Sequence, residues 1–265
     1  MHKSARHPTI LPGIDAISIK SDRTFPRHSH DEFGFGYVAG GGQESWSGRG
    51  LVEAEAGDTL TVNPAEIHDG IGRKGQPRHW RMLFLSQTAL ASLSGVPPGS
   101  AEFSRPVNRS RHALKLTIDA IAAVSRETPD RDQAEQLVML ALAAQLDPNS
   151  GAHVLTRSER STDVQTVLDM IRDAWDAPLS LDDFAAATQS SKFRVLRRFS
   201  RELGTTPHAY LTQHRVKRAK DMILAGSSLA ETAIACGFSD QSHLTRAFSR
   251  QLGLTPGSFA RSARH

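Results

Sequence analysis

The sequence has 265 residues but a single cysteine, and it lacks any long apolar run. One cysteine cannot close a disulfide within the chain, which suits a reducing compartment. No stretch approaches the roughly 18 consecutive apolar residues of a membrane-spanning helix. The first residues also lack the apolar segment of a secretory signal. We therefore expect a cytoplasmic protein with no membrane partner.

Residues 1–159 have no excess of positive charge, whereas residues 160–265 do. Residues 160–265 hold 15 Lys and Arg against 10 Asp and Glu, whereas residues 1–159 hold 17 against 18. A basic module is the expected footprint of a polyanionic partner. A solvated basic surface is the alternative on charge alone.

The pattern of residues 15–85 is that of a β domain. Short apolar runs at residues 33–39, 59–62 and 80–85 alternate with glycine-rich turns, which predicts a sandwich or a small barrel. Apolar residues then recur at helical spacing in residues 112–127 and again from Asp130 until Pro148. Two such helices predict a hairpin that either covers the β domain or contacts a second subunit.

Residues 148–161 are polar and have no period, which predicts a linker. Every later segment has a helical pattern. Ser and Thr at the start of a helix accept hydrogen bonds from its free N–H groups. The N-caps predicted on this basis are Thr162, Ser180, Ser191, Thr206 and Ser239.

The C-terminal module contains a weak internal repeat. SKFRVLRRFSRELGTTPHAY, from Ser191, aligns with SDQSHLTRAFSRQLGLTPGSF, from Ser239. Matching residues inside the helices are 49 positions apart but the two serines are 48 apart, so we expect one extra residue early in the second long helix. A short helix, a turn and a longer capped helix predict a helix-turn-helix in each copy. Gln189 and Gly237 occupy the two turns.

The longer helix of each copy has one apolar face and one polar face. Val195 and Phe199, and likewise Leu244 and Phe248, are predicted to face the core. Either helix alone would fit a solvated amphipathic helix, but two copies in a basic module favour DNA. Basic and amide side chains read base edges, and hydroxyls reach bases or phosphates. The candidates are Lys192, Arg194 and Arg197, and Gln241, Ser242, Thr245 and Arg246.

The segment between the copies, residues 208–225, predicts one long helix. A helix of this length spans about 27 Å. Successive major-groove segments on one side of B-DNA lie about 34 Å apart. Two recognition helices joined in this way can contact adjacent segments of double-stranded DNA. The basic side chains available for phosphates are Arg198, Arg201, Arg215, Lys217, Arg218 and Lys220.

These motifs identify a family resemblance. The stretch IACGFSDQSHLTRAFSRQLGLTPGSF, with PLSLDDFAAA and LRRFSRELGTTPHAYL before it, resembles the AraC/XylS family of bacterial transcription regulators over residues 162–261. The resemblance implies that two recognition helices dock in adjacent major grooves. It adds Phe193 and Leu196 to Arg197 as base readers. Thr232 departs from the Ile or Leu usual in the family.

The resemblance also implies an α+β chain of two domains. A cupin-like β-barrel that senses a ligand would occupy residues 1–107, and a helical hairpin for homodimerisation residues 108–147. A linker would cover residues 148–161, and an all-α DNA-binding domain with two helix-turn-helix motifs joined by a long helix residues 162–265. The stretches FPRHSHDEFGFGYVAGGG and AGDTLTVNPAEIHDG resemble the cupin-type sensor.

Three histidines form the candidate ligand site. His28 and His30 would point to one side of a strand, and the cupin resemblance brings His68 beside them. With Glu32 they could bind a divalent metal such as Zn, Ni or Fe. In a metal-free pocket they would instead hydrogen-bond to each other or to an organic effector. The candidate pocket residues are His28, His30, Tyr37, Trp46, Asn63 and His68.

The function predicted is therefore ligand-controlled, sequence-specific DNA binding without catalysis. The alternative is a metal-dependent cupin enzyme with a helical appendage. A DNA-repair methyltransfer protein is excluded on composition, because no cysteine precedes Cys236. We expect Cys236 to be a small apolar core residue, as free cysteines often are.

Overall fold

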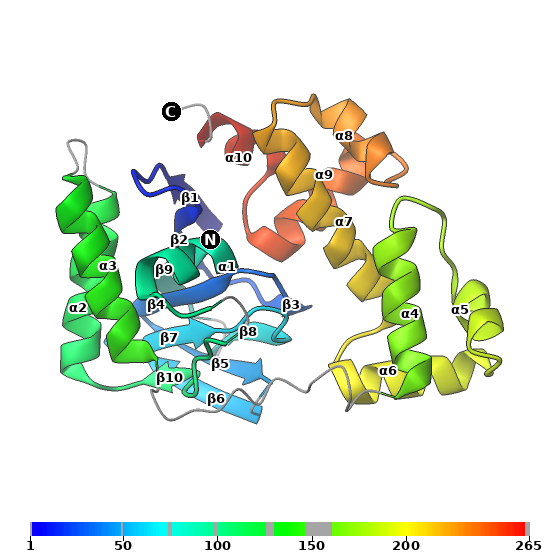
Figure 1. Cartoon of the computed structure of the whole chain (residues 1–265), viewed down its shortest axis with the longest axis horizontal. Helices are drawn as coiled ribbons and strands as arrows, with labels where there is room; N and C mark the ends of the chain where they lie inside the picture. The colour runs from blue at the N-terminus through cyan, green and yellow to red at the C-terminus, as the bar shows by residue number, and fades with distance from the viewer. Residues whose placement is uncertain are drawn as a thin grey trace. The chain divides into compact units, whose positions relative to one another are not determined.

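The computed structural model describes residues 2–48, 50–73, 76–97, 100–125, 130–146 and 161–262. The described residues fold as two compact units, one within residues 2–146 and one within residues 161–262. The first is rich in strands and the second is helical (Figure 1), which confirms the predicted order of a sheet-rich and a helical domain. The predicted linker lies outside the described residues, apart from Ser161. Within the described ranges, no helix has the length and apolar character needed to span a membrane.

The described strands of the first unit form two sheets. A six-stranded sheet has the order β1-β2-β9-β4-β7-β10, and a four-stranded sheet has the order β3-β8-β5-β6. In the described residues the two sheets do not join into one closed barrel. The strands are β1 (His2–His7), β2 (Ile14–Ser21), β3 (Phe25–His28), β4 (Phe33–Gly40), β5 (Gly42–Ser47), β6 (Gly50–Glu55), β7 (Thr59–Val62), β8 (His68–Gly72), β9 (Arg78–Leu85) and β10 (Val107–Asn108).

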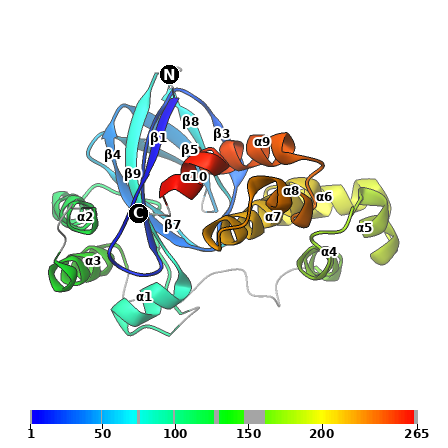
Figure 2. The same ribbon diagram turned by 90° about the horizontal axis from the view of Figure 1, so that it is seen from above.

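Helices cover one face of the six-stranded sheet. They are α1 (Gln87–Ser94), α2 (Arg111–Val124) and α3 (Arg131–Gln145), of which α2 and α3 are the predicted hairpin. Phe33 and Phe35 of β4 are buried against the residues of this hairpin, which lies beside the sheet in Figure 2. Val38 packs on Ala54 of β6 in a separate cluster. Alternate side chains of a strand face opposite sides, so the other face of β4 looks toward the four-stranded sheet.

The second unit is a pair of helix-turn-helix motifs. Its helices are α4 (Thr162–Asp173), α5 (Leu181–Ala187), α6 (Lys192–Leu203), α7 (Pro207–Leu224), α8 (Leu229–Ala235), α9 (Gln241–Leu252) and α10 (Pro256–Ser262). Helices α5 and α6 form the first motif, α8 and α9 the second, and α7 connects them. Val195, Phe199, Leu244 and Phe248 are buried as predicted.

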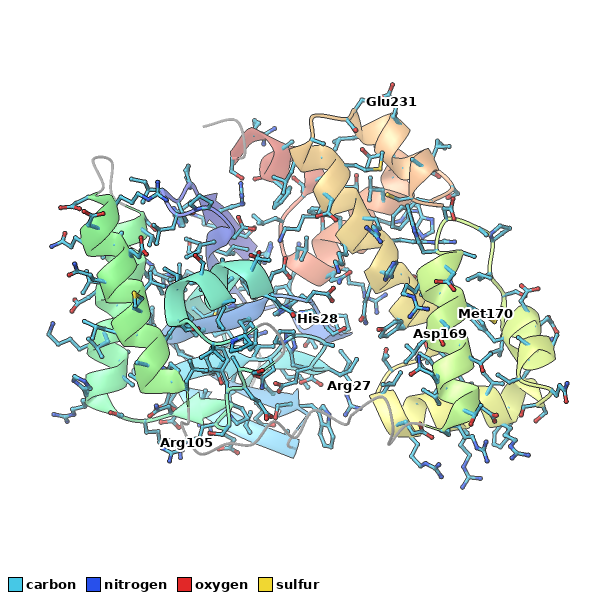
Figure 3. All side chains as sticks on the ribbon, in the orientation of Figure 1. Arg27, His28, Arg105, Asp169, Met170 and Glu231 are labelled. Atoms are coloured by element: carbon cyan, nitrogen blue, oxygen red, sulfur yellow. The ribbon has the colours of Figure 1, made fainter. Side chains whose placement is uncertain are left out.

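Helix caps explain most of the boundaries. Ser180 and Ser191 accept hydrogen bonds as predicted, and Thr206 caps α7 with a proline at its first turn. Ser228 forms a capping box with Glu231, labelled in Figure 3. Two predicted caps were wrong. Ser161, one residue earlier than Thr162, is the N-cap of α4, and Asp240 rather than Ser239 caps α9, because its carboxylate accepts from the His243 N–H.

The extra residue of the second copy lies in the turn, not in the helix as predicted. Helices α6 and α9 have 12 residues each. Gln189 and Gly237 take the equivalent left-handed turn position, with φ of 49° and 70°. One residue separates Gln189 from its N-cap, and two separate Gly237 from Asp240. An insertion inside α9 would turn every later side chain by about 100°, which would move Phe248 out of the core.

Candidate functional sites

The three histidines come together at the end of β3. His28, labelled in Figure 3, is the direct cross-strand partner of His68 on β8. The ring centroids are 4.3 Å apart for His28 and His68, and 5.0 Å apart for His30 and His68. The His30 ring also makes a T-shaped contact with Phe84 of β9, with 4.9 Å between centroids. Strand β3 ends at His28, so His30 reaches the cluster from the following loop and not from the strand as predicted.

Backbone carbonyls fix the tautomer of all three rings. The Nδ1 atoms of His28, His30 and His68 lie 2.8, 3.0 and 3.0 Å from the carbonyl oxygens of Pro26, Glu32 and Glu66. A carbonyl can only accept, so each Nδ1 carries the proton and each Nε2 is an acceptor.

Burial keeps two of these rings neutral. It lowers the pKa of His28 to about 3, and the neighbouring His68 ring adds to the effect. Burial likewise lowers the pKa of His68 to about 3, with a further contribution from His30. The neutral ring is the form that accepts a hydrogen bond or ligates a metal. Yet no set of three or more His, Cys, Asp or Glu side chains in the described residues is arranged to hold a metal ion.

Of the other predicted site residues, the metal-ligand candidate Glu32 lies beside His30, and the two aromatic pocket candidates lie elsewhere. The nearer carboxylate oxygen of Glu32 is 3.9 Å from His30 Nδ1, the nitrogen that already donates to a carbonyl. Tyr37 packs against the core under the helical hairpin, on the face of β4 away from the cluster. Trp46 is 36% exposed on β5, and the guanidinium of Arg27 stacks 4.6 Å from its ring centroid. Neither aromatic side chain joins the histidines.

The side-chain amide of Asn63 is hydrogen-bonded within the sheet-rich unit. Its Nδ2 donates to Glu66 Oε2 at 2.9 Å and to the Phe103 carbonyl at 3.0 Å. Its Oδ1 accepts from the Phe103 N–H at 2.7 Å. These bonds tie the loop just before His68 to a segment 40 residues away from Asn63. The amide is therefore occupied by the fold rather than turned to a ligand.

In the first motif, the predicted DNA-facing residues of α6 are on its outer side. Phe193 is 71% exposed, and Arg194 and Arg197 are exposed beside it. Lys192 is exposed too, with its Nζ 2.5 Å from Asp182 Oδ1. Leu196 is half-buried. The first turn of α6 thus presents an aromatic ring among basic side chains.

In the second motif, α9 presents shorter polar groups. Gln241, Ser242 and Arg246 are exposed, and Thr245 is half-buried with its hydroxyl donating to the Gln241 carbonyl at 2.8 Å. The Asp240 carboxylate accepts a hydrogen bond from the His243 N–H, which lowers the pKa of Asp240. Asp240 therefore stays ionised at the start of the helix. The two recognition helices therefore offer different chemistry at equivalent positions.

Several of the predicted phosphate contacts have partners inside the unit. Arg198 Nη1 lies 2.5 Å from Asp163 Oδ2. Arg215 donates to three backbone carbonyls, so its prediction as a phosphate contact was wrong. The sequence pattern hid this role, because the carbonyls belong to segments more than 20 residues away.

Cys236 is fully buried, as predicted. Its Sγ lies 3.7 Å from Met222 Sδ, and burial raises the pKa of the thiol to about 11. A thiol needs its ionised form to act as a nucleophile, so this site does not favour reactive chemistry.

Comparisons with known proteins agree with this division. A family model described as an AraC-like ligand binding domain matches residues 11–143, and one described as a helix-turn-helix domain matches residues 184–262. An uncharacterized HTH-type transcriptional regulator of Bacillus subtilis, YbfI, is 27% identical over 224 residues, which cover 83% of this chain and 81% of that protein.

Two further proteins are similar to this chain, one in sequence and one in fold. The bifunctional transcriptional activator and DNA repair enzyme Ada of Escherichia coli is 28% identical over 168 residues, 62% of this chain and 41% of Ada. The crystal structure of unsaturated fatty acid-bound ToxT from Vibrio cholerae has a TM-score of 0.56 at 9% identity, covering 98% of this chain and 94% of ToxT. At that identity the likeness concerns the fold alone.

Proposed function

The chain belongs to the AraC family of transcription regulators, with an N-terminal ligand-binding domain and a C-terminal helix-turn-helix domain that binds DNA, and from this we propose how each domain works. Helices α6 and α9 read two segments of operator DNA. A small molecule bound at the three histidines controls that binding. The observation that carries the DNA part is the pair of exposed first turns on α6 and α9, each anchored by a buried phenylalanine.

Base reading is tested on DNA selected by the full chain from a random library. Arg246→Ala and Arg197→Ala should each weaken binding roughly 5- to 150-fold at physiological salt and relax the sequence preference, as loss of a bidentate base contact costs about 1–3 kcal/mol. Arg250→Ala and Arg201→Ala, in the last turns of the same helices, are the controls. Neither should change the sequence preference, because loss of a phosphate contact weakens binding to all sequences alike. Equal losses on selected and scrambled DNA would refute base reading.

For the effector, we propose an organic molecule that donates hydrogen bonds to the Nε2 acceptors of His28 and His68. Their neutral rings support this choice. We also propose that the sheet-rich unit is a cupin-like barrel, although its two sheets are not joined at their edges in the described residues. A thermal-shift screen of alcohols, phenols and amines should find ligands that raise the melting temperature, since ligand binding to the native state stabilises it. The shift should vanish in His68→Asn. Stabilisation by Zn²⁺, Ni²⁺ or Fe²⁺ alone would favour the metal alternative.

We propose that the hairpin forms a homodimer. Ile118 on α2 and Met139 and Leu140 on α3 are exposed apolar side chains, and Leu140 is 52% exposed. Sedimentation of the full chain should give a dimer, and Leu140→Glu should give a monomer because it places a charge in the apolar contact. Gln87→Glu adds the same charge at an exposed position of α1, outside the hairpin, and should remain dimeric.

We also propose that the chain is not an enzyme and acts in the cytoplasm, where its promoter DNA lies. The buried thiol of Cys236, with its raised pKa, supports the absence of a methyl-accepting site. Incubation with methylated DNA should therefore leave the mass of the protein unchanged.

A further inference from the structure

One arginine links the two helix-turn-helix motifs. Arg215 lies within α7, the helix that connects them. Its Nε donates to the Trp175 carbonyl at 2.8 Å and its Nη2 to the Ala177 carbonyl at 2.7 Å. Its Nη1 donates to the Gly237 carbonyl at 2.8 Å. The first two carbonyls belong to the segment between α4 and α5, at the start of the first motif, and the third belongs to the turn of the second motif.

The two segments also touch each other at this point. Gly237 has a φ of +70°, and a Cβ built on it would lie 2.7 Å from the Asp176 carbonyl oxygen and 3.0 Å from Arg215 Cζ. A side chain at position 237 would therefore push the second turn away from residues 175–177. The glycine serves the turn and also allows this close approach.

Only a guanidinium can make this set of bonds. It presents its N–H groups in one rigid plane, whereas a lysine ammonium is a point charge on a flexible stem. Among the described residues Arg215 is held by carbonyl oxygens and has no carboxylate within ion-pair distance. Peptide dipoles from both motifs thus converge on one planar group, which restricts rotation of each motif about α7.

We infer that Arg215 is a positioning residue that fixes the distance and angle between α6 and α9, and thereby sets the operator spacing that the chain accepts. Both recognition helices pack on α7, so the movement left to them is rocking of each motif on that helix. Arg215 opposes this rocking. The consequence for DNA rests on the proposed function, in which both helices read bases.

A spin-label measurement tests the positioning without DNA. In a Cys236→Ala full-length chain, nitroxides are attached at Arg201→Cys and Arg250→Cys, exposed positions in the last turns of α6 and α9. An excess of unlabelled chain is added so that a dimer carries labels on one copy only. We expect one narrow distance distribution, a broader one in Arg215→Lys, and an unchanged one in the control Arg218→Lys. An unchanged distribution in Arg215→Lys would overturn the inference. Loss of helical circular dichroism in that variant would also overturn it, because Arg215 would then be needed for folding.

Operator spacing tests the consequence. Selected DNA with one base pair inserted between the two contacted segments should bind the wild type at least about 10-fold more weakly, since each step moves and rotates the second groove. The affinity of Arg215→Lys for DNA should fall less than about 3-fold on the same insertion. Its affinity for DNA with a single contacted segment should be unchanged. Equal spacing dependence in both proteins would overturn the inference. Failure of the wild type to select any sequence would refute base reading, while the spin-label result would still decide the role of Arg215.

Discussion

Two buried threonines of this chain differ in whether the hydroxyl has a partner. Thr117 donates to the Ala113 carbonyl at 2.8 Å and accepts from Gln145 Nε2 at 3.3 Å. Thr232 is equally buried, yet its Oγ1 has no hydrogen-bond partner in the described residues. The family resemblance marks Thr232 as a departure from Ile or Leu. The structure indicates that this departure leaves a polar atom unsatisfied.

Thr232→Val should therefore raise the free energy of unfolding of the helical unit by about 1 kcal/mol, since it removes a buried hydroxyl without a partner and keeps the shape. Thr117→Val should lower that of the sheet-rich unit by a similar amount. Urea unfolding followed by circular dichroism and tryptophan fluorescence measures both. Destabilisation by Thr232→Val would mean that the hydroxyl is bonded.

Phe193 is the residue that most distinguishes the two recognition helices, because the equivalent position in α9 is Ser242. An exposed aromatic ring at the first turn suits apolar contact with a thymine methyl group. Phe193→Ala should weaken binding several-fold only where thymine faces α6. Exchanging that thymine for uracil, which lacks the methyl, should weaken the wild type equally and the variant no further. The same exchange in the segment facing α9 is the control, and additive losses would refute the contact.

The turns of the two helix-turn-helix motifs can be compared by one substitution in each. Both positions have a positive φ, but one is a glutamine and the other a glycine. Gln189→Gly should stabilise the helical unit by about 1 kcal/mol, because glycine adopts this conformation without strain. Gly237→Ala should destabilise it by more than about 1 kcal/mol, because the methyl group also meets the Asp176 carbonyl. Thermal unfolding compares the two, and opposite signs are the expected result.

The helix ends and the strands β4, β7 and β9 were predicted well, whereas the end of β3 was not, for a physical reason. The caps at Ser180 and Ser191 and the ends of α6 and α9 depend on residues within one turn, which the sequence displays directly. The cap at Asp240 was missed because Ser239 also has a suitable side chain. Strand β3 was expected to include His30, but it ends two residues earlier, where pairing with β8 stops. Pairing depends on a partner strand that no local pattern contains.

The stability of the whole chain should depend on pH through the buried histidines. His28 and His68 have a pKa of about 3 in the folded protein and about 6.5 when unfolded. Between these values the unfolded chain binds more protons, so the stability present above about pH 6.5 is lost as the pH falls. The loss approaches about 1.4 kcal/mol per pH unit for each histidine.

Urea unfolding of the full chain between about pH 5.5 and 7.5 measures this slope for the sheet-rich unit. The double variant His28→Asn with His68→Asn should lose most of this pH dependence. A smaller slope should remain, because burial also lowers the pKa values of His7 and His79. His112→Asn, at an exposed position of α2, is the control. A slope unchanged by the double substitution would contradict the neutral state of the cluster.

For this molecule, the sequence by itself determined the helical unit and the buried faces of α6 and α9. Helical period, caps and a repeat are local properties that survive without the rest of the fold. Only the tertiary structure decided that His28 pairs with His68, that Asn63 bonds to Phe103, and that Arg215 holds two motifs together. Those partners are 40, 40 and 22 residues apart. Contacts at such separation depend on which faces pack together, and packing is a property of the whole chain.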